Sequence, residues 1–113
     1  MFGRTPEMIE YGKKMDLLDK EAQWLLRCAK EAKKEGLVED ETVRTVYWAI
    51  HPCWDWRRSS AYVTEKAIEA TIVAHEIAWR VLREGRTSLT PDEVRAIGEA
   101  ERKARKRRIG RGY

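Results

Sequence analysis

Apolar residues recur with helical spacing in four segments of this chain, and no segment alternates apolar and polar residues long enough to be a strand. The first segment, residues 6–35, begins at Thr5 and Pro6, a pair typical of a helix start, and stops before Gly36. It predicts one long helix with a continuous apolar seam at alternating spacings of three and four, formed by Met8, Tyr11, Met15, Leu18, Ala22, Leu25, Ala29 and Ala32.

The second and third segments predict a short helix and a long one. The short helix covers 40–50 and ends before Pro52, because the residue preceding a proline disfavours the helical conformation. Residues 51–60 are then expected to form a loop. The long helix covers 60–84, with Ser59 or Ser60 as its cap, and it is apolar around most of its circumference, which predicts a central position.

The fourth segment, 91–108, starts at Thr90 and Pro91, with Glu93 placed to complete a capping box. The chain is therefore expected to be all-α, a compact or partly open arrangement of four helices. Residues 1–100 form the helical domain in this interpretation, and residues 101–113 form a basic C-terminal arm that continues the last helix.

Charge divides the chain in a way that its overall net charge of +4 conceals. Residues 101–113 contain seven basic residues and one acidic residue, whereas the preceding hundred residues contain 16 basic and 18 acidic ones. A basic terminal block is typical of an arm that binds a polyanion, because cations that neutralise phosphates release counterions. The expected contacts in this block are Arg102, Lys103, Arg105, Lys106, Arg107, Arg108 and Arg111.

A second candidate contact lies in the expected loop, where Trp54 and Trp56 stand beside Arg57 and Arg58. Aromatic rings stack on bases while guanidinium groups bind phosphate, so the two arginines join the expected nucleic-acid site. Tryptophans in a small helical protein more often belong to the core or to a subunit interface, and the sequence leaves this choice open for the five tryptophans.

Catalytic and metal sites find little support in the sequence. The acidic residues Glu65, Glu69 and Glu76 and the neighbouring His75 lie on one predicted helix, but their spacing departs from that of a carboxylate-bridged metal site. No glycine-rich phosphate loop is present. We therefore expect no enzyme activity, no metal and no cofactor.

The remaining composition bears on the setting of the protein. Asparagine is absent and glutamine occurs once, while Glu, Lys and Arg are abundant, as expected for a protein selected at high temperature. No apolar run predicts a membrane span or an export signal. Two cysteines, Cys28 and Cys53, leave open whether one disulfide forms.

An all-α chain of this size, with a seam on its long first helix, no catalytic motif and a basic terminus, resembles the coat proteins of filamentous viruses of hyperthermophilic archaea. The resemblance implies many copies, as dimers, that wrap double-stranded DNA in a filament. In that group the DNA-wrapping arm is often N-terminal, whereas here residues 1–5 contain only Arg4.

The sequence thus predicts a non-enzymatic structural protein that binds nucleic acid without sequence preference, most simply double-stranded DNA through its backbone, and that self-associates. Its expected location is the virion, or the nucleoid if the protein is cellular. Whether the nucleic acid is DNA or RNA stays open. The alternatives are a small helical DNA- or RNA-binding regulator, a ribosome-associated protein and, third, a carboxylate metal enzyme.

Overall fold

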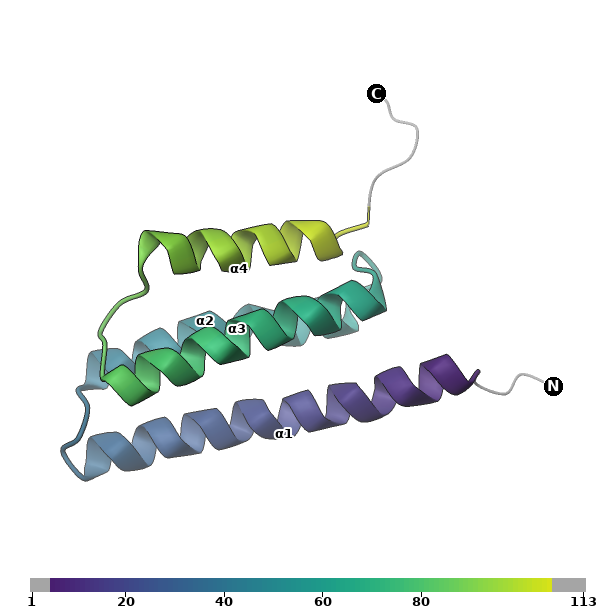
Figure 1. Ribbon diagram of the computed structural model, residues 1–113. Coiled ribbons are helices and arrows are strands. Elements are labelled where there is room, and N and C mark those ends of the chain that lie inside the picture. The colour runs from purple at the N-terminus through teal and green to yellow at the C-terminus, as the bar shows by residue number, and fades with distance from the viewer. Residues whose placement is uncertain (1–4, 107–113) are drawn as a thin grey trace.

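The computed structural model describes residues 5–106 and shows four helices (Figure 1). Within this range the backbone forms no strand beyond one isolated bridge between Tyr62 and Arg105, so the all-α prediction is confirmed. Over the same range, none of the helices combines the length and apolarity needed to cross a bilayer. The helices are α1 (Pro6–Lys34), α2 (Asp40–Arg58), α3 (Thr64–Glu84) and α4 (Pro91–Ala104).

The helices form two thin layers. α1, α3 and α4 lie side by side, and α2 packs on the far side of α3 (Figure 1). α3 contacts each of the other helices, whereas α1 and α4 lie on opposite sides of it and do not touch within residues 5–106. The arrangement is therefore partly open, and α3 holds the central position that its apolar circumference predicts.

The inner surface of α3 consists largely of alanine. Ala67, Ala70, Ala74 and Ala78 are all buried, and small side chains at helical spacing let a neighbouring helix approach closely. α2 fills this surface with Val46, Ala49, Ile50, Cys53 and Trp56. Two clusters make up the core, one around Leu25 of α1 and one around Cys53 and Trp56.

The predicted loop at 51–60 is wrong, because α2 continues through Pro52 to Arg58. A proline inside a helix removes one backbone hydrogen bond and costs about 3 kcal/mol. Burial of Cys53 and Trp56, which continue the inward stripe of Val46 and Ala49, offsets this cost. The sequence contains this stripe, but a proline is the stronger local signal for a helix end.

Two further helix boundaries differ from the prediction. Neither Ser59 nor Ser60 caps α3; Val63 is the N-cap, and Ser59 Oγ accepts from Ala61 N at 3.1 Å. α4 ends at Ala104, short of residue 108, because Arg105 turns into an extended conformation and pairs with the α2–α3 linker. The start of α4 is confirmed: the capping box of Thr90 and Glu93 is complete.

α1 confirms the long first helix, and Gly36 ends it with a positive φ of 78°. Its seam is covered only in part. Leu18, Leu25 and Ala29 are buried, whereas Met8 near the N-terminal end remains more than half exposed. The first turns of α1 extend beyond the other helices (Figure 1).

Two glycines give a test of this architecture. Gly98 lies inside α4, and a Cβ added there would meet nothing within 4 Å, so Gly98→Ala should raise the free energy of unfolding by about 0.5–1 kcal/mol. Gly85 ends α3 at φ 63°, so Gly85→Ala should lower the free energy of unfolding by about 1 kcal/mol. Urea unfolding monitored by circular dichroism measures both changes in the free energy of unfolding. The architecture requires that these two changes have opposite signs.

Candidate nucleic-acid interface

The end of α4 is fastened to the linker between α2 and α3. Val63 N donates to Ala104 O at 2.8 Å, and Lys106 N donates to Ala61 O at 2.8 Å. Ala104 itself is buried beside the Cys53 and Trp56 cluster. The first part of the basic segment is therefore held to the bundle by backbone hydrogen bonds. We call residues 101–106 and the linker 59–63 the basic corner.

Side chains reinforce the basic corner. Tyr62 Oη donates to Glu101 Oε2 at 2.5 Å, and Arg105 binds the same oxygen at 2.6 Å. Burial alone would raise the pKa of Glu101, but the hydrogen bonds from Tyr62 and Arg105 outweigh it and lower that pKa. Burial and the neighbouring carboxylate raise the pKa of Tyr62, so its hydroxyl stays protonated and keeps donating.

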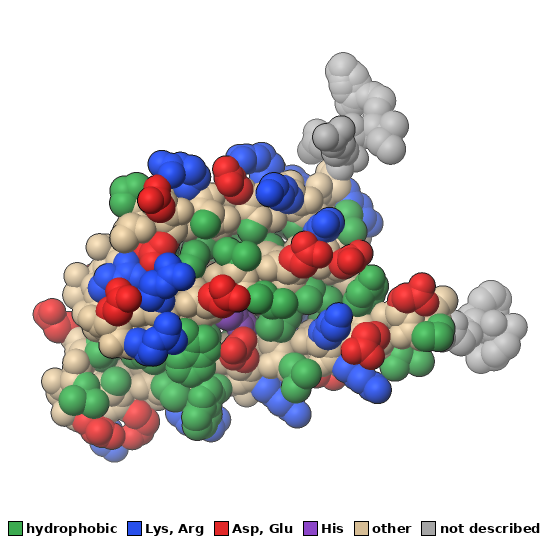
Figure 2. All heavy atoms as spheres, in the orientation of Figure 1, with side chains coloured by type: hydrophobic (Ala, Val, Ile, Leu, Met, Phe, Trp, Pro, Cys, Tyr) green, Lys and Arg blue, Asp and Glu red, His purple; other side chains and the backbone are tan. Residues whose placement is uncertain are grey.

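Three of the predicted contacts in this corner present their charge to solvent. Arg102, Lys103 and Lys106 are exposed and make no ion pair with any residue between 5 and 106, while Arg105 is neutralised by Glu101. Figure 2 shows Lys and Arg side chains spread over α4 up to the grey C-terminal residues. The other predicted contacts, Arg107, Arg108 and Arg111, lie outside the described residues.

The predicted contacts Arg57 and Arg58 have a different setting, because both guanidinium groups bind Asp19 of α1. The Arg57 side chain is 1% exposed and also donates to Thr71 Oγ1 at 3.3 Å. Burial raises the pKa of Asp19, but the hydrogen bonds from Arg58 and Arg57 reverse the effect and lower it. Arg57 thus faces the interior, and Arg58 lies half exposed over the Trp54 ring at 3.3 Å.

The tryptophans divide between core and surface. Trp56 is buried, and Trp79 is partly buried with its Nε1 donating to Glu21 Oε2 at 3.1 Å. The other three are at least half exposed: Trp24, Trp48 and Trp54. Of the two rings beside Arg57 and Arg58, Trp56 therefore lies in the protein interior and Trp54 lies at the surface.

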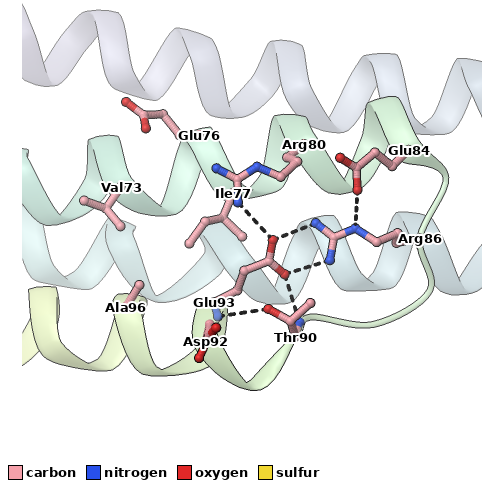
Figure 3. A pocket seen from close by; sticks show the side chains of 10 residues that line it. All are labelled: Val73, Glu76, Ile77, Arg80, Glu84, Arg86, Thr90, Asp92, Glu93 and Ala96. Carbon is pink, nitrogen blue, oxygen red and sulfur yellow. Dashed lines mark hydrogen bonds and ion pairs between the residues drawn. The ribbon is translucent and has the colours of Figure 1, made fainter.

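A hollow of about 610 Å³ lies between α3 and α4 (Figure 3). Arg86 binds both oxygens of Glu93, at 2.8 and 2.6 Å, and Arg80 approaches the same carboxylate at 3.3 Å. Asp92, Glu76 and Glu84 add further negative charge to the lining. Because its arginines are committed to Glu93, this hollow does not favour a phosphate ligand.

The residues considered for metal binding are dispersed. Glu65, Glu69 and Glu76 are exposed on α3, whereas His75 is buried with Nδ1 2.6 Å from Glu21 Oε1. Burial lowers the pKa of His75 despite the nearby carboxylate. Across residues 5–106 no three His, Cys, Asp or Glu side chains gather as metal ligands.

The two cysteines are free thiols, which settles the question of a bridge between them. Cys53 is fully buried and burial raises its pKa to about 11, so it stays protonated. Cys28 is partly exposed.

No protein family, curated protein or solved structure matches this chain.

Sequence reasoning missed the partners that set this geometry. Asp19 meets Arg57 and Arg58, and Glu101 meets Tyr62, across separations of 38 or 39 residues. No local spacing indicates such contacts, because periodicity reports only neighbours on one helix.

The role of Asp19 is open to a direct test. Asp19→Ala leaves the buried Arg57 guanidinium without its carboxylate and should lower the free energy of unfolding by about 3 kcal/mol. Asp16→Ala, at an exposed position on the same helix, is the matched control and should change it by less than about 0.5 kcal/mol. Equal effects in chemical denaturation would contradict a structural role for the Asp19–Arg57 pair.

Glu93 predicts how stability depends on pH. The hydrogen bond from Arg86 holds the pKa of Glu93 at about 2, below its ordinary value of 4.5, so its stabilisation is present at neutral pH and is lost as pH falls from about 5 towards 2. Glu93→Gln should be about 2 kcal/mol less stable than wild type at pH 7. The difference should shrink steadily towards pH 2.

Thermal or urea unfolding at a series of pH values measures this difference. Glu99→Gln, exposed on the same helix, is the control and should follow the wild-type curve. A Glu93→Gln deficit that stays constant down to pH 2 would contradict the assignment.

Proposed function

We propose that this protein is a non-enzymatic, sequence-independent nucleic-acid-binding protein that coats or packages double-stranded DNA, as a subunit of a filamentous virion. The observation that carries the proposal is the basic corner. There, backbone hydrogen bonds hold the start of a strongly basic segment against the bundle while three cations face solvent.

This arrangement suits phosphate binding for a physical reason. Arg102, Lys103 and Lys106 have no ion pair to give up within residues 5–106, so a phosphate does not have to displace a carboxylate. The fixed backbone also reduces the conformational freedom lost on binding. The sequence beyond Lys106 adds Arg107, Arg108 and Arg111 to the same charge.

The outer face of α4 supports the proposal. Arg95, Gly98 and Arg102 follow one another at spacings of three and four and are all exposed, so they share one face of the helix. Gly98 has open space where a side chain would lie, and a glycine allows another backbone to approach closely. We expect a sugar-phosphate backbone to approach this face over Gly98 and to bind Arg102, and Arg95 can join once it exchanges its exposed ion pair with Asp92.

Contacts of this kind read no base sequence, because phosphates are alike along the whole duplex. The chain is rich in arginine and lysine and has no asparagine and one glutamine. This composition favours contacts to the phosphate backbone over hydrogen bonds to base edges. Uniform binding along a duplex is the property that a coat or packaging protein requires.

The salt dependence of binding tests the basic corner. The triple variant Arg102→Gln, Lys103→Gln, Lys106→Gln should reduce the slope of log affinity against log salt by about 2–3, at about 0.9 per lost phosphate contact. Lys13→Gln, Lys20→Gln, Lys30→Gln removes the same charge from exposed positions on α1 and should leave the slope nearly unchanged. Fluorescence anisotropy with a labelled duplex of about 25 base pairs measures both.

Three results would contradict the proposal: equal slopes for the two triple variants, a preference of about a thousandfold for one duplex sequence, or binding confined to RNA. The second would indicate a regulator and the third an RNA-binding protein.

Electron microscopy of the protein mixed with long DNA should show continuously coated filaments.

A further inference from the structure

α2 carries a second seam on the side that faces away from α3. Six exposed positions follow spacings of three, four, three, four and three along the whole helix. This is the spacing by which one helix packs along another, yet within residues 5–106 the only ion pair that joins it to another helix is that of its last residue, Arg58, with Asp19 of α1. We call it the α2 seam: Glu41, Arg44, Trp48, His51, Asp55 and Arg58.

The middle of the α2 seam is aromatic. Trp48 is 67% exposed, and the His51 ring stacks on Tyr47 with 4.9 Å between centroids. Tyr47 and Trp54 flank the seam and are also exposed. Exposed aromatic side chains grouped on one face are typical of protein interfaces, where their burial supplies most of the binding free energy.

The charges of the seam favour one particular partner, a second copy in antiparallel orientation. In a single antiparallel register Glu41 faces the second copy's Arg58, Arg44 faces its Asp55, and Trp48 faces its His51. Each pairing occurs twice because of the two-fold symmetry. A parallel arrangement would instead place every charge against its own copy, which is unfavourable.

We infer that this protein forms a two-fold symmetric dimer through the α2 seam, with the two α2 helices antiparallel. The aromatic middle supplies buried apolar area, and the charged ends set the orientation and register. The antiparallel helix dipoles add to this preference, since the acidic first turn of one α2 meets the basic last turn of the other.

The same charges argue against nucleic acid on this surface. The seam holds two acidic and two basic residues, so it offers no net positive charge to a phosphate backbone. It lies on a different helix from the exposed cations of the basic corner. The dimer therefore does not depend on the proposed function, and it should form without nucleic acid.

Existing ion pairs do not prevent this pairing. Arg44 binds Asp40 and Glu41 at the surface, and such exposed pairs contribute little and exchange readily. Arg58 binds Asp19 of α1 through a half-exposed guanidinium, and Asp19 keeps the buried Arg57 as its partner when Arg58 turns to Glu41 of the second copy. Asp55 makes no ion pair with residues 5–106, so it is available to a partner's arginine.

Sedimentation equilibrium without nucleic acid tests the dimer. The wild-type chain should be dimeric, and Trp48→Ala should raise the dissociation constant at least about tenfold. Trp24→Ala is the matched control, because Trp24 is also about half exposed but lies on α1 outside the seam, and it should leave the constant unchanged. Circular dichroism should show the same helix content in both variants.

A charge exchange tests the orientation independently. Asp55→Arg should weaken the dimer about tenfold by facing the second copy's Arg44 with a like charge, and the double variant Arg44→Asp, Asp55→Arg should restore it. Asp16→Arg, an equal charge change on α1, should have no effect.

Two results would overturn the inference. One is a wild-type chain that stays monomeric at about 100 μM, well above the Kd of an ordinary stable dimer. The other is a dimer that responds to Trp24→Ala or Asp16→Arg and not to the seam variants. Neither result bears on the salt dependence of DNA binding, so the two proposals fail separately.

Discussion

The packing of α2 against the alanine face of α3 is the constraint on which the rest of the structure depends. Ala67, Ala70 and Ala74 let the two helices approach closely, and Cys53 and Trp56 fill the space between them. This burial keeps α2 helical through Pro52 and carries it on to Arg58. A shorter α2 would leave Trp56 without its place in the core.

The extension of α2 to Arg58 sets the charge arrangement near the linker between α2 and α3. It brings Arg57 into the interior, where a guanidinium group requires a carboxylate partner. Asp19 of α1 supplies this carboxylate. The extension also leaves only a short linker before α3. Ala61 and Val63 of this linker then bind the backbone at the end of α4, which fixes the basic corner.

The same packing separates two surfaces with different chemistry. Because one side of α2 is buried on α3, its other side is presented to solvent with aromatic residues in the middle and opposite charges at the ends. The exposed cations of the basic corner lie instead at the end of α4. The proposed self-association and the proposed polyanion binding would use surfaces that do not compete, because the two-layer arrangement keeps these surfaces apart.

The sequence by itself determined the number of helices, the starts of α1 and α4, the glycine stops of α1 and α3 and the central place of α3, because capping residues and apolar periodicity act within one helix. Only the tertiary structure decided that α2 passes through Pro52, that Arg57 is buried on Asp19, and that the basic segment turns extended at Arg105. The last two depend on contacts between residues about 40 apart, which leave no periodic signal in the chain. The first depends on burial against α3, which outweighs the local signal of the proline although the apolar stripe itself continues through it.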